Sequence, residues 1–359
     1  MNNIKRIQEA LIRKDLDAIL LTDEKNQRYA AGFPFTDGIV VVSREKAWLL
    51  TDSRYIEAAE KTAGNCCTVQ MFDNSHSMAE LLAAALKECG AEKVAAEDEK
   101  LSRARWTLLE EHLGISLLPA GGLLGELRAS KSEEEIASMI RAQRISEKAL
   151  DAVLKIIRPG MTEKEVMAEL VYHMLKNGSE GNSFDPIVVT GANTSMPHGV
   201  PGDTVIRAGD FITMDFGSLS DGYCSDMTRT VAVGYATEEM KNVYYTVLEA
   251  QLAGIAAARS GIPGKEIDRA AREVIEKAGY GAYFGHGFGH SLGLDIHEPP
   301  MAGPRGEAPM VENDLCSAEP GIYLPGKFGV RIEDVMIIRS DGAEVITKAP
   351  KSELIVLGA

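Results

Sequence analysis

The pattern of hydrophobic and polar residues divides the chain into two parts with different periodicity. In the first part, short apolar runs bounded by turn-forming residues alternate with segments of helical spacing. Strands are predicted at the apolar runs, which cover residues 17–21, 38–42, 47–51, 68–72 and 93–96. Helices are predicted at 78–89, with Ser77 as the N-cap, and at 103–112. Residues 1–125 are therefore expected to form a small α/β domain that ends close to Gly121-Gly122.

The second part, residues 126–359, has longer amphipathic helices separated by Gly-rich, strand-like segments. Two capping-box sequences each open a helix, Ser132-Glu133-Glu134-Glu135 and Thr162-Glu163-Lys164-Glu165. The helical pattern covers residues 132–157, 162–176, 238–259 and 265–277. Residues 126–359 are therefore expected to form a second domain of mixed helices and strands.

A weak internal repeat runs through the second part. Its matching positions are Pro159-Gly160 with Pro263-Gly264, Asp210 with Asp314, Asp215 with Glu319, Asp226 with Glu333, and more loosely His198 with His297. Such a repeat predicts two similar α+β units that face each other around one shared site.

Two predicted hairpins place acidic residues in pairs. Each hairpin has one acid on either strand at equal distance from the turn: Asp215 and Asp226 on strands 210–216 and 222–233, and Glu319 and Glu333 on strands 315–323 and 330–338. Residues directly opposite in a hairpin have Cβ atoms ~5 Å apart, so like charges there repel each other. A cation between them removes the conflict, and carboxylate oxygens suit hard divalent ions. We therefore expect a metal site built from these four acids.

Histidines are concentrated in the same part of the chain. His286, His290 and His297 lie within twelve positions, and the alternating glycines of 285–290 favour extended backbone that puts His286 and His290 on one face. His198 fits a loop residue and a site residue equally well. His173 falls in a predicted helix and is expected to be structural.

The charge balance excludes several partners. The chain has 38 basic and 53 acidic residues, a net charge of −15, which disfavours nucleic acids and anionic membranes because both are polyanions. No apolar run approaches the ~20 residues that span a bilayer, and the first residues lack a secretory signal. The five cysteines show no disulfide spacing, so a reduced, cytoplasmic protein is expected.

These motifs resemble the metallopeptidase family of aminopeptidase P, prolidase and methionine aminopeptidase, whose catalytic domain has the pita-bread fold. The matching stretches are Met214-Asp215-Phe216-Gly217, Ser225-Asp226-Met227-Thr228, residues 285–298, Glu319-Pro320-Gly321 and Arg331-Ile332-Glu333-Asp334. The resemblance extends over most of residues 130–359, and the order Asp, Asp, His, Glu, Glu is highly specific. The preceding α/β domain is similar to that of aminopeptidase P and prolidase.

The resemblance also implies roles for individual residues. Five positions match the metal ligands: Asp215, Asp226, His290, Glu319 and Glu333, with Asp226 and Glu333 bridging two divalent ions. Manganese or cobalt is common in the family, and zinc is a further choice. The catalytic positions are His198, His297 and Glu319, with Glu319 as the proton acceptor from water. His286, Tyr323 and Arg331 match substrate-binding positions more loosely.

The activity that the resemblance implies is removal of an N-terminal residue from peptides with proline second, by a homodimer. One alternative is an Xaa-Pro dipeptidase, which needs a group that recognises the product-side carboxylate, and Arg331 and Lys327 are candidates. A non-catalytic peptide-binding module is an alternative of another class. The presence of all five ligands disfavours it, and disfavours creatinase-like chemistry for the same reason.

Overall fold

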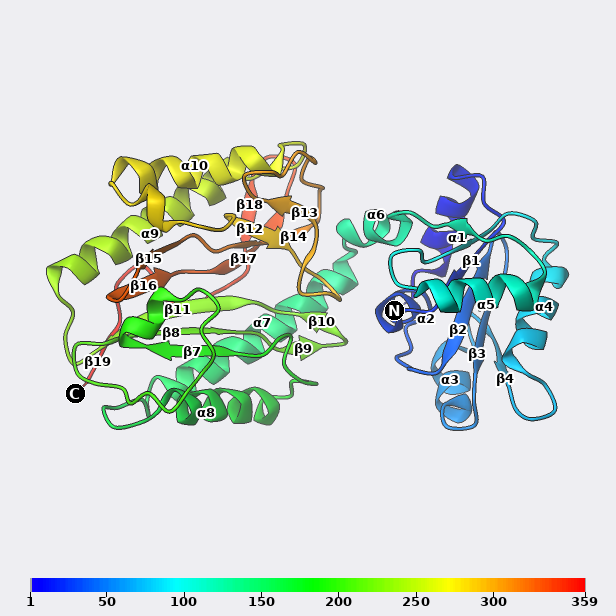
Figure 1. The fold of residues 1–359 in the computed structure, drawn as a ribbon, viewed down its shortest axis with the longest axis horizontal. Coiled ribbons are helices and arrows are strands. Elements are labelled where there is room, and N and C mark those ends of the chain that lie inside the picture. The colour runs from blue at the N-terminus through cyan, green and yellow to red at the C-terminus, as the bar shows by residue number, and fades with distance from the viewer. Residues whose placement is uncertain (1, 359) are drawn as a thin grey trace. The chain divides into compact units, whose positions relative to one another are not determined.

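Alternating strands and helices build an N-terminal unit that ends at Arg128 in the computed structural model, which describes residues 2–358. Its six-stranded sheet has the order β4-β3-β2-β1-β5-β6 (Figure 1). The strands are β1 (Ala18–Leu21), β2 (Gly38–Ser43), β3 (Ala47–Thr51), β4 (Thr68–Met71), β5 (Val94–Ala96) and β6 (Leu118–Pro119). Every residue of β1, β2 and β3 is buried, as their continuous apolar sequences require.

Six helices accompany this sheet. They are α1 (Ile4–Arg13), α2 (Glu24–Ala31), α3 (Ile56–Ala63), α4 (Met78–Glu88), α5 (Arg103–Leu113) and α6 (Leu123–Ala129). Ser77 caps α4 in a complete capping box, as predicted from the sequence. Helices α1, α2, α3 and α6 were not predicted.

The second unit begins at Ala129 and consists of two halves. In the first half, α7 (Glu133–Val153) and α8 (Glu163–Lys176) cover a sheet of order β19-β11-β8-β7. Its strands are β7 (Ile187–Thr190), β8 (Phe211–Phe216), β11 (Met227–Val233) and β19 (Val356–Leu357). Ser132 and Thr162 cap the two helices with the predicted capping boxes.

The second half repeats this plan. Helices α9 (Glu238–Ala257) and α10 (Gly264–Lys277) cover a sheet of order β13-β12-β14-β17-β18. Its strands are β12 (Gly289–Ser291), β13 (Glu298–Ala302), β14 (Leu315–Ala318), β17 (Asp334–Ile338) and β18 (Ala343–Val345). The two helix pairs lie on opposite sides of this unit with the strands between them (Figure 1).

Short elements connect the larger ones. Two small hairpins are formed by β9 (Leu219–Ser220) with β10 (Tyr223–Cys224), and by β15 (Gly321–Leu324) with β16 (Phe328–Arg331). Two 3₁₀ turns are η1 (Gly191–Ser195) and η2 (Gly281–Tyr283).

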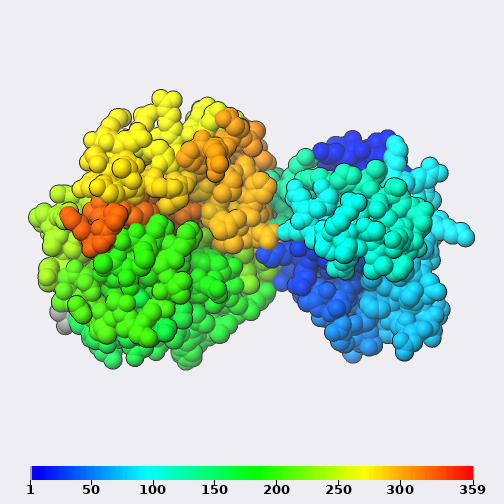
Figure 2. Space-filling model, in the orientation of Figure 1, coloured from blue at the N-terminus to red at the C-terminus, as the bar shows by residue number. Residues whose placement is uncertain are grey.

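In the space-filling view the green first half and the yellow and orange second half of this unit meet face to face (Figure 2). The predicted fold class, an α/β domain followed by an α+β domain with an internal repeat, is confirmed.

Each half has its own hydrophobic core beneath its helices. One core joins α7 and α8 to β7, β8 and β11, and the other joins α9 and α10 to β14 to β17. The helix-covered face of each sheet is thus filled with apolar side chains, which leaves the opposite faces for polar residues. Across residues 2–358, no helix is both long enough and apolar enough to cross a bilayer.

Candidate metal centre

The alternation of residues along β8 decides where Asp215 points. Ile212, Met214 and Phe216 pack into the core beneath α7 and α8. Asp215 lies between two of them in the strand, so its side chain is on the opposite face of the sheet. That face meets the second half, because Arg331 of β16 donates a hydrogen bond to Asp215 Oδ2.

The pairing of the first predicted hairpin differs from the expectation. Asp215 lies opposite Thr228 and not opposite Asp226. The chain reverses at Asp221 and Gly222, whose φ angles of 51° and 75° are those of a tight turn, one residue later than predicted. Asp226 is therefore the diagonal neighbour of Asp215 on the same face, where such neighbours are ~7–8 Å apart. The two acids share a face as expected, but the prediction that they are directly opposed was wrong.

The second predicted hairpin has the expected register. Strand β14 pairs with β17, and β15 pairs with β16, in one continuous alignment. Glu319 and Glu333 occupy the interval between the two paired segments and face each other there. Gly326, with φ of 73°, occupies the turn at which this hairpin reverses.

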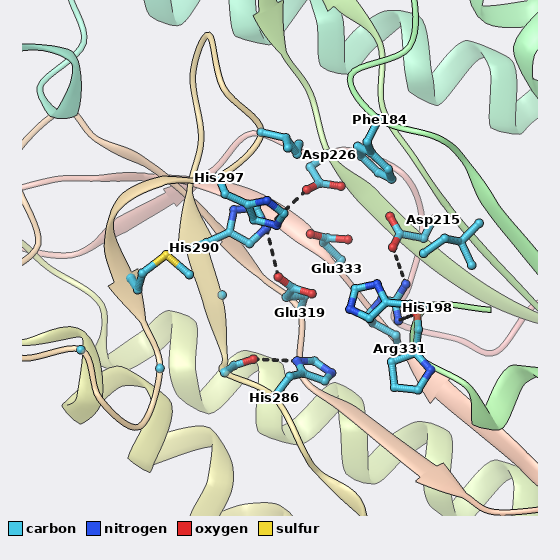
Figure 3. A pocket seen from close by; sticks show the side chains of 18 of the residues that line it. Phe184, His198, Asp215, Asp226, His286, His290, His297, Glu319, Arg331 and Glu333 are labelled. Carbon is cyan, nitrogen blue, oxygen red and sulfur yellow. Dashed lines mark hydrogen bonds and ion pairs between the residues drawn. The ribbon is translucent and has the colours of Figure 1, made fainter. Parts of the chain in front are cut away.

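His290, on β12, points its free nitrogen at the acids. Its Nδ1 lies 3.1 Å from the carbonyl oxygen of Ser291, so the neutral ring carries its proton on Nδ1 and leaves the Nε2 lone pair available. Nε2 is 3.3 Å from Glu319 Oε1 and 3.7 Å from Asp226 Oδ2. Burial lowers the pKa of His290, which favours the neutral ring. Figure 3 shows the imidazole between these two carboxylates.

The acids and His290 have the properties of a metal site. Ligand atoms of Asp226, His290 and Glu333 all lie within 4.8 Å of one another. Among the described residues, Oδ1 of Asp215 and Oδ1 of Asp226 are buried without a hydrogen-bond donor. Burial, reinforced by neighbouring carboxylates, raises the pKa of Asp226, Glu319 and Glu333. Buried acids without donors are costly, and oxygens with one imidazole suit divalent ions. The donor set therefore fits the expected metal.

Two further predicted histidines lie beside this cluster. The ring of His297 packs edge-on against His290, with centroids 4.2 Å apart and planes at 64°. His198 follows η1, is exposed, and lines the same cavity. His173 lies on α8 with its Nε2 3.8 Å from Glu169 Oε2, and it does not line the cavity.

The remaining three predicted residues form a hydrogen-bonded chain. Arg331 Nη1 donates to the hydroxyl oxygen of Tyr323 at 3.1 Å, and that hydroxyl lies 2.8 Å from His286 Nε2. His286 Nδ1 is 2.8 Å from the carbonyl oxygen of Gly287, so Nε2 accepts the proton of Tyr323. Burial raises the pKa of Tyr323 to about 12, which keeps the hydroxyl protonated. His286 and Arg331 line the cavity, and Tyr323 lies behind them and joins them.

The cluster opens into a cavity of about 580 Å³. Apolar side chains on its wall include Phe184, Ile187 and Met301. The wall also includes Arg305, an exposed residue between β13 and β14 that was not predicted from the sequence. A lone arginine in a loop carries no periodicity or motif, so only the folded structure associates it with the site.

Comparisons with known proteins agree with the architecture of both units. Residues 137–340 match metallopeptidase family M24, and residues 3–130 match the creatinase/prolidase N-terminal domain. An Xaa-Pro dipeptidase from Pyrococcus horikoshii is 34% identical over 350 residues, 97% of each chain.

Solved structures give the same result. The chain is 42% identical to an Xaa-Pro dipeptidase from Bacillus anthracis, with a TM-score of 0.93 and coverage of 99% of both chains. It is 34% identical to an X-Pro aminopeptidase from Thermotoga maritima, with a TM-score of 0.92 and coverage of 98% of this chain and 100% of the other. The second unit therefore has the pita-bread fold, and the chain belongs to metallopeptidase family M24, with a creatinase/prolidase domain in front of the catalytic one.

Proposed function

We propose that the protein is a metal-dependent exopeptidase that hydrolyses the N-terminal peptide bond of substrates with proline in the second position. The observation that carries the proposal is the group of buried carboxylates at the cavity, two of which have an oxygen without a donor. The names of the related Xaa-Pro dipeptidase and X-Pro aminopeptidase support the preference for proline.

Five residues are the proposed ligands of two divalent ions: Asp215, Asp226, His290, Glu319 and Glu333. Manganese is the metal we propose, with cobalt or zinc as alternatives, because four carboxylates and one imidazole without a thiolate suit a hard ion. When bound, such ions polarise the scissile carbonyl and lower the pKa of the attacking water.

Glu319 is the proposed proton acceptor from that water. Burial raises its pKa, which makes its carboxylate a better base near neutral pH. Ser317 Oγ donates a hydrogen bond to Glu319 Oε1 at 3.1 Å, which holds that oxygen and leaves Oε2 to take the proton.

His198 and His297 are the proposed partners of the scissile bond. Both line the cavity, and imidazoles there can stabilise the oxyanion that develops on the carbonyl and pass a proton to the leaving nitrogen. The nitrogen of proline is a tertiary amide without N–H, in a ring of fixed geometry. A site with proton donors at the bond and an apolar wall fits this ring better than a site that needs an N–H donor from the substrate.

The preference for proline is tested with matched peptides. The manganese-loaded protein is expected to give a higher kcat/KM on Xaa-Pro substrates than on Xaa-Ala substrates with the same first residue. Equal or reversed values would remove the proline claim and leave the metallopeptidase assignment in place.

A specific observation favours the dipeptidase alternative. Arg305 is an exposed cation on the cavity wall, and an arginine can hold a carboxylate with two parallel hydrogen bonds. The two cations considered from the sequence are engaged elsewhere, since Arg331 pairs with Asp215 and Lys327 pairs with Glu239 at 2.8 Å. Arg305 is therefore the better candidate to bind the free carboxylate of an Xaa-Pro dipeptide.

The length preference is tested with one pair of variants. Arg305→Gln is expected to raise KM for an Xaa-Pro dipeptide by about 10-fold or more, since a hydrogen bond to a charged group is lost. KM for a longer Xaa-Pro peptide should not change. Arg259→Gln, at an exposed arginine outside the cavity, is the control. If Arg305→Gln raises KM equally for the dipeptide and for the longer peptide, Arg305 does not select dipeptides, and the aminopeptidase form of the proposal stands.

We also propose a cytoplasmic homodimer without nucleic-acid or membrane partners. The net charge of −15 repels polyanions, and all five cysteines are free thiols. Light scattering coupled to size-exclusion chromatography tests the dimer, which requires twice the monomer mass of 38.8 kDa.

A further inference from the structure

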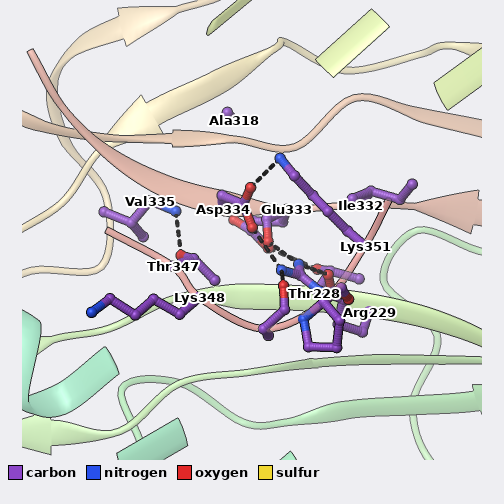
Figure 4. Close-up of polar contacts among 12 residues, drawn as sticks. Thr228, Arg229, Ala318, Ile332, Glu333, Asp334, Val335, Thr347, Lys348 and Lys351 are labelled. Carbon is purple, nitrogen blue, oxygen red and sulfur yellow. Dashed lines mark hydrogen bonds and ion pairs between the residues drawn. The ribbon is translucent and has the colours of Figure 1, made fainter. Parts of the chain in front are cut away.

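A buried group of polar side chains lies directly behind the paired acids, on the side away from the cavity. Asp334 follows Glu333 in extended backbone, so the two carboxylates point to opposite faces. Asp334 is fully buried. It accepts a hydrogen bond from Arg229 Nη2 at 2.8 Å and pairs with Lys351 Nζ (Figure 4).

Arg229 stabilises the segment that carries Glu333 through hydrogen bonds to backbone carbonyls. Its Nη1 donates to the carbonyl oxygens of Glu333 at 2.6 Å and Thr228 at 2.9 Å. Its other nitrogens donate to the carbonyl oxygens of Ala349 at 2.7 Å and Pro350 at 3.1 Å. One buried guanidinium thus joins β11, the Glu333 segment and the C-terminal segment that contains Lys351.

Gln251, on α9, holds the peptide units that precede both facing acids. Its Nε2 donates to the carbonyl oxygen of Ala318 at 2.8 Å and to that of Ile332 at 3.1 Å. The next residues after these carbonyls are Glu319 and Glu333. The orientation of the amide is fixed from its other end, because Lys351 Nζ donates to Gln251 Oε1 at 2.5 Å.

We propose that Lys351 is a positioning residue for the metal centre. Together with Arg229, Gln251 and Asp334, it forms what we call the Lys351 network, which fixes the spacing of Glu319 and Glu333 from behind. Lys351 Nζ is the shared donor to Asp334 and Gln251. Its removal leaves a buried carboxylate with one cation fewer and frees the Gln251 amide to turn away from the two carbonyls.

The functional consequence is weaker metal binding and not merely lower stability. Residues that orient metal ligands through hydrogen bonds typically contribute 10–100-fold to metal affinity. This inference rests on the proposed function, because Glu319 and Glu333 must be ligands. The C-terminal segment is then part of the catalytic apparatus although it does not line the cavity.

The test compares two lysines of one segment. Lys351→Met keeps the length of the side chain and removes its charge, and its side chain is 18% exposed, so replacement is tolerated sterically. Lys348→Met is the matched control, because Lys348 is exposed and points away from the Lys351 network (Figure 4). Manganese binding is measured by equilibrium dialysis with metal analysis, and thermal unfolding is recorded on the metal-free proteins.

Lys351→Met is expected to bind Mn²⁺ about 10- to 100-fold more weakly than wild type, while Lys348→Met binds as wild type. Lys351→Arg should recover most of the affinity because it keeps the charge and the donors. If Lys351→Met does not fold, Lys351→Gln takes its place. Wild-type affinity in the folded variant would overturn the inference and leave the proposed function standing. A wild-type protein that binds no divalent ion would overturn both.

Discussion

At the scale of single residues, burial and like charge act in the same direction on the acids of the cavity. Both raise the pKa of Asp226 and Glu333, and burial raises that of Glu319. Without metal, the folded protein therefore keeps protons on these acids to a higher pH than the unfolded chain does. Divalent ions must displace these protons, which couples metal binding to pH.

This coupling predicts how stability changes with pH. Acids with raised pKa values in the folded state contribute stability below their unfolded pKa, and this contribution is lost as pH rises through their folded pKa values. The melting temperature of the metal-free protein should fall from mildly acidic to mildly alkaline pH, and manganese should restore it most at alkaline pH. Scanning calorimetry measures the melting temperature against pH with and without manganese. Asp226→Asn is the control, because it removes one of these acids and should flatten the curve of the metal-free protein. If the melting temperature of the metal-free protein rises across this pH range, that result would contradict the raised pKa values of these acids.

His297 separates chemistry from metal binding. It packs against His290 and lines the cavity, but it is outside the proposed ligand set. His297→Ala is expected to keep its metal while kcat falls roughly 10²-fold or more, as when a group that stabilises transition-state charge is removed. Metal analysis and steady-state kinetics on the same sample show whether the metal stays bound while kcat falls. Loss of metal would make His297 a ligand.

At the scale of the elements, a second buried network holds the strand that carries His290. Lys131, just before α7, pairs with Asp314 at 2.5 Å and with Glu298 at 3.5 Å. Asp314 in turn accepts a hydrogen bond from Ser291 of β12. Burial raises the pKa of Asp314 to about 6. Lys131 thus compensates buried acids that border β13 and β14.

Lys131→Met should lower the free energy of unfolding of this unit by roughly 3–5 kcal/mol, because it leaves buried acids without their cation. Lys148→Met, at an exposed position of α7, is the control and should change little. Urea unfolding gives both values. If Lys131→Met lowers the free energy of unfolding no more than the control does, the buried acids are compensated by other groups.

The elements also show what the sequence could predict. Long helices with capping boxes were found at their starts, since Ser132 and Thr162 are local signals. Helices α2 and α3 are only eight residues long, too short for a periodic pattern to stand out. The predicted register of the first hairpin differs from the observed one because the chain turns at Asp221-Gly222 and not one residue earlier. A shift of one residue at the turn moves the partner of Asp215 by two, from Asp226 to Thr228.

The site was predictable where motif and strand pattern coincide. Asp215 and Glu333 interrupt apolar strand segments. Asp226, His290 and Glu319 lie in stretches that resemble the motifs of the family, so all five positions could be proposed from the sequence. Arg305 and Lys351 lie in segments without periodicity. Arg305 reaches the cavity wall only in the folded chain, and Lys351 contacts Gln251 and Asp334, which are distant in the sequence. The pairing of Arg331 with Asp215 depends on two strands from different halves, which no local pattern encodes.

At the scale of the whole molecule, each half of the catalytic unit holds only part of the cluster. Asp215 and Asp226 come from the first half, and His290, Glu319 and Glu333 come from the second. The halves are joined where Glu333 N donates to Thr228 O at 3.1 Å, and Thr228 Oγ1 donates to Glu333 Oε2 at 2.7 Å. Metal binding is therefore expected to require the complete catalytic unit.

Divalent ions bound at this cluster are expected to make the protein an Xaa-Pro peptidase. The most direct measurement strips the protein with a chelator, adds Mn²⁺ in steps, and records metal content and Xaa-Pro hydrolysis on the same samples. We expect no hydrolysis by the stripped protein and a rate that rises with metal occupancy until the site is full. Full activity in a sample shown to contain no metal would contradict it.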